Sequence, residues 1–278
     1  MKQLLQVMPR GYEADLLQCE KEDLEEIRLR AGQPLVLRYA GREISLFPRL
    51  KQENIEAVLM SACRQSVYAY ADTIRHGYVT LENGHRVGIC GFGVMRNGEI
   101  QTIRTVSSLC IRIAKQVVGC ADTLLPRITG SALLVGPPGS GKTTLLRDLV
   151  RQLSDVRGEY VCLADERSEL SAGVFGAPQL QIGTRTDVLI NIPKAEAAMM
   201  MLRTMSPQWI ALDEITSAAD ISAMEQIVYC GVHVLATAHA NDMDDLMKRP
   251  LYRNMMQSGF FEKIVFLEAD KTFSVKEL

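Results

Sequence analysis

An eight-residue segment, 136–143, constrains the fold of this chain more than any other feature. It fits the pattern G-x-x-x-x-G-K-[ST] at every fixed position. Glycines at these places let consecutive backbone N–H groups close around phosphate oxygens, while the lysine reaches the β- and γ-phosphates and the hydroxyl binds Mg²⁺. The residues predicted to hold a nucleoside triphosphate are Gly136, Pro137, Pro138, Gly139, Ser140, Gly141, Lys142, Thr143 and Thr144.

The residues on either side of this segment support the same interpretation. Residues 132–135 are apolar and predict a short buried strand, and the apolar residues over 145–153 recur at helical spacing. The segment therefore joins a strand to the N-terminus of a helix, where free N–H groups and the helix dipole both favour an anion. We expect Lys142 to contact the phosphates and Thr143 to bind Mg²⁺.

Composition excludes several classes of protein. The length of 278 residues favours two domains at about 150 residues each. Hydrophobic residues make up 47% and charged residues 23%, an ordinary globular composition. The formal net charge of −2 gives no global attraction to nucleic acid or anionic lipid, so we expect no nucleic-acid partner.

The cysteines and the apolar runs predict a cytoplasmic protein. The seven cysteines are scattered singly, without C-x-x-C pairs, and an odd count is typical of reduced thiols. No apolar stretch approaches the length of a membrane span. We therefore expect no direct membrane insertion, and any association with a membrane to depend on partner proteins.

Residues 1–120 are predicted to form an α+β domain. Short strands over 24–30, 35–39 and 43–46 make a small antiparallel sheet, and the apolar spacing from about 54 to 74 predicts one amphipathic helix that covers it. Two Asn-Gly pairs, at 83–84 and 97–98, are typical of tight hairpins and predict a three-stranded meander over residues 77–114.

Residues 121–278 are predicted to form an α/β domain with a parallel sheet. Apolar strands near 132–135, 160–164, 209–212 and 232–236 alternate with helical stretches. Ligands of such sheets bind at the carboxyl ends of the strands. Residues 171–193 contain several Gly and Pro and predict a long loop, and the Met-rich stretch 194–205 predicts a helix that packs on the core.

Three polar clusters follow predicted strands of this second domain. Asp213 and Glu214 end one strand, an arrangement in which the aspartate serves the metal and the glutamate polarises water. An acidic cluster over 165–169 contains Glu166 and Glu169 and suits a general base. His239 ends a further strand, where a γ-phosphate sensor lies in RecA-like motors.

Arginine dominates the basic residues of the first domain. Its planar fork suits phosphate, and such residues complete the active site of a neighbouring subunit in several NTPases. The candidates for this role are Arg86, Arg104 and Arg112 on the meander, together with Arg203 in the second domain.

The order of these motifs resembles that of the secretion ATPases of type II and type IV systems and of the pilus retraction motors. In that family an acidic box, a Walker B strand end and a His box follow the phosphate loop, as 165–169, 213–214 and 237–242 do here. Residues 26–38 are similar to the opening of the family's PAS-like N-terminal domain. The resemblance covers nearly the whole chain.

Within this family, residues 77–88 and 163–169 look most similar to the stage III sporulation AA family. The resemblance implies a RecA-like P-loop NTPase core behind a PAS-like domain, with ATP and Mg²⁺ bound and ATP hydrolysed. It also implies a cytoplasmic hexameric ring that drives an integral membrane channel or secretion complex during endospore formation. The ring would lie at the inner face of the membrane through its partners.

The resemblance leaves the catalytic base open. Secretion ATPases usually carry Gly-Glu where this chain has Asp213 and Glu214, so the base is Glu214 or a member of the pair Glu166 and Glu169. Glu169 is favoured because it occupies the last position of the acidic box, where the family places its catalytic glutamate. The tetracysteine metal insertion of many type II ATPases is absent, which argues against a zinc site.

Two other functions stay open at this point. One is a nucleotide-dependent assembly scaffold with little hydrolysis, and the other is a DNA-dependent RecA-like ATPase. A small-molecule kinase fits the acidic and histidine motifs poorly. An ABC transporter subunit is disfavoured because no Ser-Gly-Gly-type signature precedes residue 213.

Overall fold

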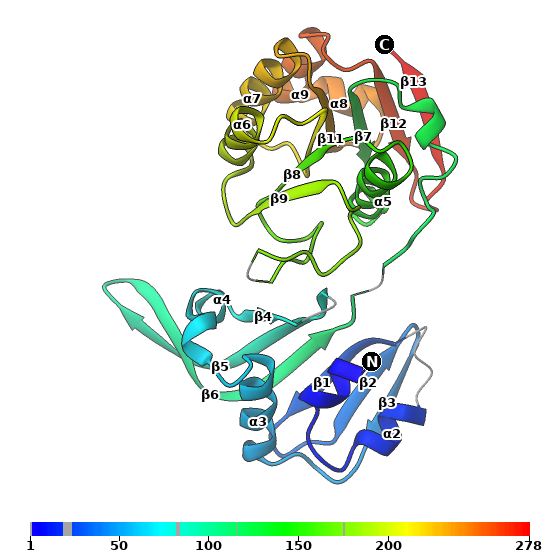
Figure 1. Cartoon of the computed structure of the whole chain (residues 1–278). Coiled ribbons are helices and arrows are strands. Elements are labelled where there is room, and N and C mark those ends of the chain that lie inside the picture. The colour runs from blue at the N-terminus through cyan, green and yellow to red at the C-terminus, as the bar shows by residue number, and fades with distance from the viewer. Residues whose placement is uncertain (1, 19–23, 82–83, 115, 175) are drawn as a thin grey trace. The chain divides into compact units, whose positions relative to one another are not determined.

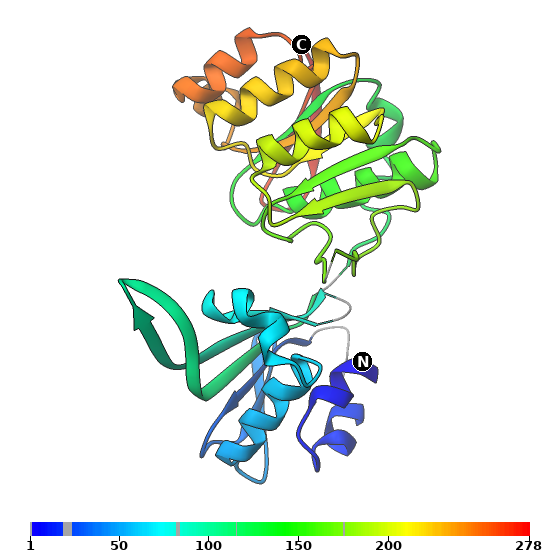
Figure 2. The ribbon, with the colours of Figure 1, turned by 60° about the vertical axis from the view of Figure 1, so that its left-hand side comes forward.

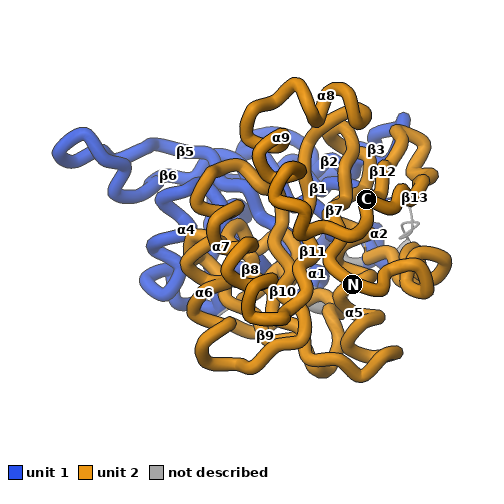
Figure 3. The backbone as a smooth tube through the Cα atoms, turned by 90° about the horizontal axis from the view of Figure 1, so that it is seen from above, with its two compact units in different colours: residues 1–115 blue, residues 116–278 orange. Residues whose placement is uncertain are grey.

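The computed structural model describes residues 2–18, 24–81, 84–114, 116–174 and 176–278 (Figure 1). The chain divides into two compact units, residues 1–115 and 116–278, drawn in blue and orange in Figure 3. The sequence places this boundary near residue 120, whereas residues 116–120 belong to unit 2. Gln116 shows why, because its side-chain amide exchanges hydrogen bonds of 3.0 and 3.1 Å with the backbone of Gln181.

Unit 1 forms, within the described residues, a six-stranded sheet in the order β3-β2-β1-β6-β5-β4. Its elements are α1 (Lys2–Val7), α2 (Glu13–Gln18), β1 (Leu24–Arg30), β2 (Leu35–Tyr39), β3 (Arg42–Leu46), α3 (Gln52–Ala62), η1 (Val67–Tyr70), α4 (Ala71–Arg75), β4 (Tyr78–Thr80), β5 (Arg86–Arg96) and β6 (Glu99–Arg112). All neighbouring strands are antiparallel. The pairing of β1 with β6 joins the predicted small sheet and the predicted meander into one sheet. Its likeness to a PAS domain stays a prediction.

The turn between β5 and β6 confirms the expected hairpin. Asn97 and Gly98 have φ values of 52° and 81°, and a type I′ turn requires positive φ at both central residues. Asn83, which belongs to the other predicted Asn-Gly turn, lies outside the described residues.

The single helix predicted over residues 54–74 is wrong. Helix α3 ends at Ala62, and Arg64 and Gln65 then have φ values of 49° and 63°. Left-handed residues cannot continue a right-handed helix, so the chain turns before η1 and α4 begin. The apolar spacing was compatible with one helix because α3, η1 and α4 all bury side chains in the same core.

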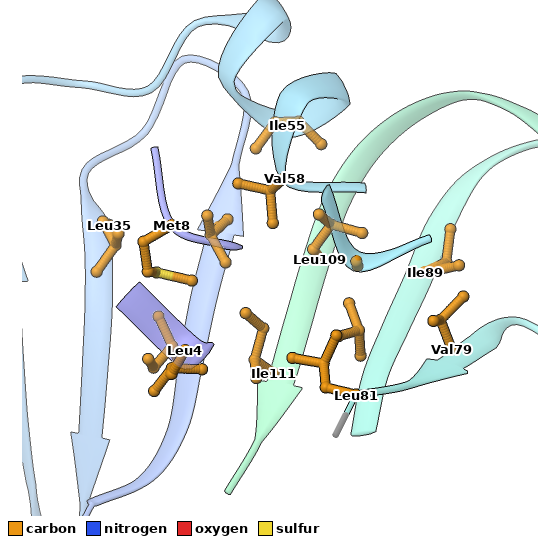
Figure 4. Close-up of a cluster of buried hydrophobic side chains, with 14 of the residues drawn as sticks. Leu4, Met8, Leu35, Ile55, Val58, Val79, Leu81, Ile89, Leu109 and Ile111 are labelled. Carbon is orange, nitrogen blue, oxygen red and sulfur yellow. The ribbon is translucent and has the colours of Figure 1, made fainter. Parts of the chain in front are cut away.

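The core of unit 1 lies between the sheet and its helices (Figure 4). Leu4 from α1, Val58 from α3 and Ile111 from β6 belong to this cluster and are almost completely buried. Removing such side chains from water is the main favourable term in folding. The stability of unit 1 therefore depends on this layer of apolar side chains.

Substitution of Ile111 by alanine is expected to lower the free energy of unfolding by about 2–5 kcal/mol, because it removes buried methyl groups and leaves a cavity. Urea denaturation measures this loss. Ile100 is the matched control, since it lies on the same strand with half of its surface exposed. Ile100→Ala should change stability by no more than about 0.5 kcal/mol. Equal losses from the two variants would contradict this description of the core.

Unit 2 forms, in the part of the chain that is described, a seven-stranded sheet in the order β13-β12-β7-β11-β10-β8-β9. Its elements are η3 (Leu125–Arg127), β7 (Ala132–Gly136), α5 (Lys142–Asp155), β8 (Val161–Asp165), β9 (Thr186–Ile190), α6 (Lys194–Thr204), β10 (Trp209–Leu212), α7 (Ala218–Tyr229), β11 (His233–His239), α8 (Met243–Lys248), α9 (Pro250–Gln257), β12 (Lys263–Leu267) and β13 (Phe273–Glu277). All neighbouring pairs are parallel except β12 with β13. The predicted parallel α/β sheet is confirmed.

Helices cover both faces of this sheet (Figure 2). Strand β7 shows the division, because successive side chains of a strand point to opposite faces. Leu133 and Val135 pack into the cluster that contains α6, α7 and α9, whereas Ala132 and Leu134 pack into the cluster that contains α5. The phosphate-loop helix α5 is thereby held on one face and the Met-rich helix α6 on the other.

The long loop predicted over residues 171–193 is interrupted by a strand. Residues Thr186–Ile190 form β9, which pairs in parallel with β8 at the edge of the sheet. An edge strand is only half covered, and the polar residues Thr186 and Asp187 at its start weaken the apolar pattern that would have identified it.

The Met-rich segment forms α6 as predicted. Its buried residues are Ala197, Ala198 and Met201, while Met200 keeps half of its surface exposed. Across the described residues, none of the helices has the length and apolar character needed to cross a bilayer.

Candidate nucleotide-binding site

The predicted motifs of unit 2 lie at one edge of its sheet. Strands β7, β11, β10 and β8 are consecutive neighbours and run in parallel. The phosphate loop follows β7, His239 ends β11, Asp213 follows β10, and the acidic box begins at the end of β8. Because parallel strands end at the same edge, motifs far apart in the sequence are brought together at the usual ligand side of an open α/β sheet.

The glycines of the phosphate loop are required by its backbone. Gly139 and Gly141 have φ values of 78° and 93°, which favour glycine, and Gly141 is the residue from which α5 starts. At Gly136 the constraint is space, since a Cβ atom would lie 2.7 Å from Oγ of Ser140 and 2.8 Å from the carbonyl oxygen of Leu267. The loop therefore has no room for a side chain at residue 136.

The donors of this loop fit a polyphosphate. The first N–H groups of a helix have no carbonyl partner within the helix, and Gly141 supplies no side-chain cap to α5. The buried hydroxyl of Ser140 also has no hydrogen-bond partner among the described residues. Unpaired donors at a helix N-terminus are what an anionic ligand requires.

Lys142 lies folded back over the loop. Its ammonium donates to the carbonyl oxygens of Gly136 and Pro137 at 2.8 Å each, and its Nζ atom lies 3.0 Å from Nδ1 of His239. Burial lowers the pKa of Lys142, while the charges of Asp213 and Glu214 act in the opposite direction. The lysine is thus a partly desolvated cation, and its charge interacts more strongly with a phosphate than it would in bulk water.

Thr143 and Asp213 provide oxygens suited to Mg²⁺. The Thr143 hydroxyl donates to Oδ2 of Asp213 at 3.2 Å, and Oδ1 accepts from the Thr237 hydroxyl at 2.7 Å. No cluster of three or more His, Cys, Asp or Glu side chains in the described residues could hold a metal by itself. Mg²⁺ typically takes only one or two protein ligands plus waters and substrate phosphates, so this pair fits it.

His239 connects the lysine of the loop to Glu214. The ammonium of Lys142 lies 3.0 Å from Nδ1 of His239, and Nε2 of the same ring lies 3.2 Å from Oε1 of Glu214. Oε2 of the same carboxylate lies 3.8 Å from Arg167. Glu214 therefore already contacts two basic side chains, and its φ of 40° places it in the sparsely populated left-handed region.

The acidic box over 165–169 divides into one structural and two surface carboxylates. Asp165 is buried and accepts hydrogen bonds from the backbone N–H groups of Glu169, Leu170 and Ser171 at 2.9, 3.1 and 2.8 Å. The Ser171 hydroxyl adds a fourth at 2.6 Å. Asp165 consequently shapes the turn, while the side chains of Glu166 and Glu169 stay exposed.

One hollow gathers the predicted catalytic carboxylates. Glu166, Glu169, Asp213 and Glu214 all line it, together with Lys194. The Lys194 ammonium lies 3.3 Å from Glu166 and 3.9 Å from Asp220. Residues that follow β8 and β10 and the first residue of α6 thus meet beside Thr143 and Asp213.

The predicted arginines do not gather in this hollow. Arg86 stacks on the Tyr78 ring at 3.8 Å, and Arg112 lies 3.7 Å from Glu26. Arg104 is exposed opposite Phe92 on β5. These three belong to unit 1, and the fourth, Arg203, lines a different hollow of unit 2 beside α7. Their action in a neighbouring subunit stays a prediction.

Two basic residues near the site were missed by the sequence reasoning. Lys194 begins the Met-rich helix and Arg147 lies within the helix that follows the phosphate loop, and neither belongs to one of the motifs above. The spacing of Arg147 was a usable signal, because residues four apart lie on the same helix face and Arg147 follows Thr143 by four. No comparable signal in the sequence connects Lys194 with Glu166.

Comparison with known proteins identifies the family. The family model for sporulation stage III, protein AA matches residues 3–276. The chain belongs to this family. It is 35% identical to Stage III sporulation protein AA of Bacillus subtilis (strain 168), over 98% of this chain and 92% of that protein.

Two solved structures, an ATPase and a pilus retraction motor, are similar in fold to this member of the stage III AA family. The ATPase DotB of Legionella pneumophila matches with a TM-score of 0.60 and 17% identity, over 96% of this chain and 79% of DotB. The pilus retraction motor PilT, solved with bound ADP, matches with a TM-score of 0.61 and 18% identity, over 87% of this chain and 74% of PilT. The expected RecA-like P-loop fold is thereby confirmed.

Proposed function

We propose that this chain binds Mg·ATP at residues 136–144 and hydrolyses the bond between its β- and γ-phosphates, with Glu169 as general base. One observation carries the proposal: Asp213 contacts Thr143 and also lines the hollow that holds Glu166, Glu169 and Glu214. The two residues suited to Mg²⁺, Thr143 and Asp213, and a set of carboxylates therefore lie side by side at the end of the phosphate loop. The family's likeness to secretion ATPases supports the same chemistry.

The residues of the loop have distinct roles in this proposal. The N–H groups of the loop bind the phosphates, and Lys142 leaves its carbonyl partners to contact the β- and γ-phosphates. Thr143 and Asp213 would hold Mg²⁺, which when bound neutralises charge on the β- and γ-phosphate oxygens. When Lys142 moves, Nδ1 of His239 loses its donor, and His239 becomes free to respond to the γ-phosphate while it contacts Glu214.

Glu169 is proposed as the base because its backbone is fixed beside the hollow. Its N–H group donates to the carboxylate of Asp165 at 2.9 Å, and its side chain lines the hollow. A fixed backbone with an exposed side chain allows a carboxylate to orient one water molecule and take its proton.

The same resemblance supports a ring assembly. We propose that the chain forms a homo-oligomer, six copies in the family's pattern, in which Arg86, Arg104, Arg112 or Arg203 completes the site of the next copy. Such an arginine neutralises charge that develops in the transition state. The ring would work in the cytoplasm on integral membrane proteins of a channel complex during endospore formation.

Sedimentation with and without a non-hydrolysable ATP analogue and Mg²⁺ tests the assembly. We expect a monomer or small oligomer without nucleotide and a closed ring with it, because an interfacial nucleotide stabilises the assembled state by mass action. A Lys142→Ala sample, run in parallel, should not respond to the analogue. A monomer under every condition would contradict the ring.

A further inference from the structure

Arg147 on α5 points its guanidinium into the protein interior. Only 7% of the residue is exposed. Nε donates to the carbonyl oxygen of Leu170 at 2.6 Å, and Nη2 donates to that of Glu169 at 2.7 Å. The fixed fork of a guanidinium suits two acceptors placed side by side, which a lysine cannot reproduce. Arg147 therefore holds the backbone of the acidic box from the side of the phosphate-loop helix.

The turn that Arg147 holds is strained. Ser168 and Ala172 have φ values of 55° and 49°, in a region that side chains other than glycine rarely adopt. Such conformations persist only where the surroundings over-determine them, and they cluster at functional sites. Here the carboxylate of Asp165 accepts the N–H group of Glu169 while Arg147 donates to its carbonyl oxygen. Both sides of the Glu169 backbone are thus fixed by buried charged groups.

Arg147 also connects this turn to Thr143 and Asp213, the two residues suited to Mg²⁺. It lies one helical turn after Thr143, on the same face of α5. Thr143 contacts Asp213, and Arg147 contacts the backbone of Glu169. A single rigid helix therefore sets the position of the phosphate loop relative to the acidic box.

Stability alone is a poor explanation for this arrangement. In the described part of the chain, no ion pair within 4.0 Å joins Arg147 to a carboxylate, and the guanidinium donates to the neutral carbonyl groups of Leu170 and Glu169. Burial lowers the pKa of Arg147, while the charges of Asp165, Asp213, Cys120 and Glu169 act in the opposite direction. A desolvated cation is expensive, and apolar residues of similar volume usually stabilise a core at least as well.

We propose that Arg147 is a positioning residue that fixes the Glu169 backbone so that the Glu169 carboxylate reaches the attacking water. This inference rests on the proposed function, because it requires Glu169 to act as the base. Arg147 touches neither nucleotide nor water in this role. Its effect is on the rate of the chemical step and not on the affinity for ATP.

The test compares Arg147→Met with wild type in steady-state hydrolysis and in equilibrium binding of an ATP analogue. We expect kcat to fall by about 100-fold, since a displacement of about 1 Å at a reacting group costs that much. The dissociation constant should stay within about twofold, because no binding group is removed. Arg147→Lys keeps the charge but not the planar fork, so its kcat should lie between that of wild type and that of Arg147→Met. An unchanged kcat in either variant would overturn the proposal, as would a loss confined to affinity.

Arg151→Gln is the matched control. Arg151 lies one turn further along α5 and bonds Asp148 through Nε at 2.8 Å, away from the acidic box. Its loss should affect thermal stability without changing kcat. If Arg147→Met does not fold in thermal unfolding measurements, Arg147→Lys carries the test with the same criteria. Equal losses of kcat from Arg151→Gln and the Arg147 variant would show a merely structural effect and overturn the proposal.

A double variant separates positioning from general damage. If Arg147 acts through Glu169, adding Arg147→Met to Glu169→Gln should lower single-turnover hydrolysis no further. Full additivity of the two losses would overturn the inference. If wild type itself hydrolyses no ATP, the proposed function fails instead. An active wild type with full activity in Arg147→Met rejects this inference alone.

Discussion

Lys142→Ala is expected to lower ATP turnover by about 100- to 1,000-fold, the effect of removing one preorganised donor from a site of developing charge. The structure gives the reason, because Lys142 is a partly desolvated cation at the mouth of the phosphate loop. It lies 3.0 Å from His239, so its movement onto a phosphate also changes the contacts of the His box. Phosphate release measures the loss of turnover, and binding of an ATP analogue measures the loss of affinity separately.

The control for this experiment is Lys248→Ala. Lys248 is exposed at the end of α8 in the same unit, so the variant removes an equal charge without touching the site. Thermal unfolding should show both variants folded. Undiminished hydrolysis by Lys142→Ala would contradict the assignment of the phosphate loop, whatever the behaviour of the control.

The second large effect is expected from Glu169→Gln. Loss of a general base lowers turnover by about 100- to 10,000-fold, and the near-isosteric amide should leave the affinity for ATP unchanged. Steady-state phosphate release and analogue binding measure both quantities. Glu196→Gln on α6 is a suitable control, because this carboxylate is exposed and does not line the hollow.

Glu214→Gln distinguishes Glu214 from Glu169 as the base. Glu214 contacts His239 and Arg167, so its amide variant should weaken the link to the His box and lower turnover less than Glu169→Gln does. A full loss in Glu214→Gln with an active Glu169→Gln would assign the base to Glu214. That result would also reject the positioning role of Arg147.

The elements with strong local signals were predictable from the sequence. Strand β7, the glycines of the phosphate loop and the start of α5 follow from one motif and its apolar flanks. The Asn97–Gly98 turn is fixed by a similar local rule, since both residues tolerate positive φ. The arrangement of Asp213 and the acidic box on neighbouring strands β10 and β8 followed from their places at strand ends.

Features that depend on packing were not predictable in the same way. The break after α3 is made by Arg64 and Gln65, residue types that no turn rule singles out. The edge strand β9 begins with polar residues and resembles a loop in sequence. Pairing of β1 with β6 joins segments about 80 residues apart, and nothing local in either strand specifies that partner.

In the candidate site, too, some residues carry a local signal in the sequence and others do not. The types and spacing of Lys142, Thr143 and Asp213 predict their roles, and the structure places Thr143 within hydrogen-bond distance of Asp213. The role of Asp165 was not, because an aspartate that organises a turn and one that serves catalysis look alike in an acidic run. The hydrogen bonds of the structure distinguish the two residues: the carboxylate of Asp165 holds the turn, and the backbone of Glu169 is held by it.

Steady-state phosphate release by the purified, unmodified chain tests the central claim most directly. With ATP and Mg²⁺ in excess, we predict release that continues over many turnovers and stops when EDTA removes the metal, since Thr143 and Asp213 alone cannot replace it. A chain that binds ATP but releases no phosphate would contradict the proposed hydrolysis and leave the nucleotide-dependent scaffold as the better description.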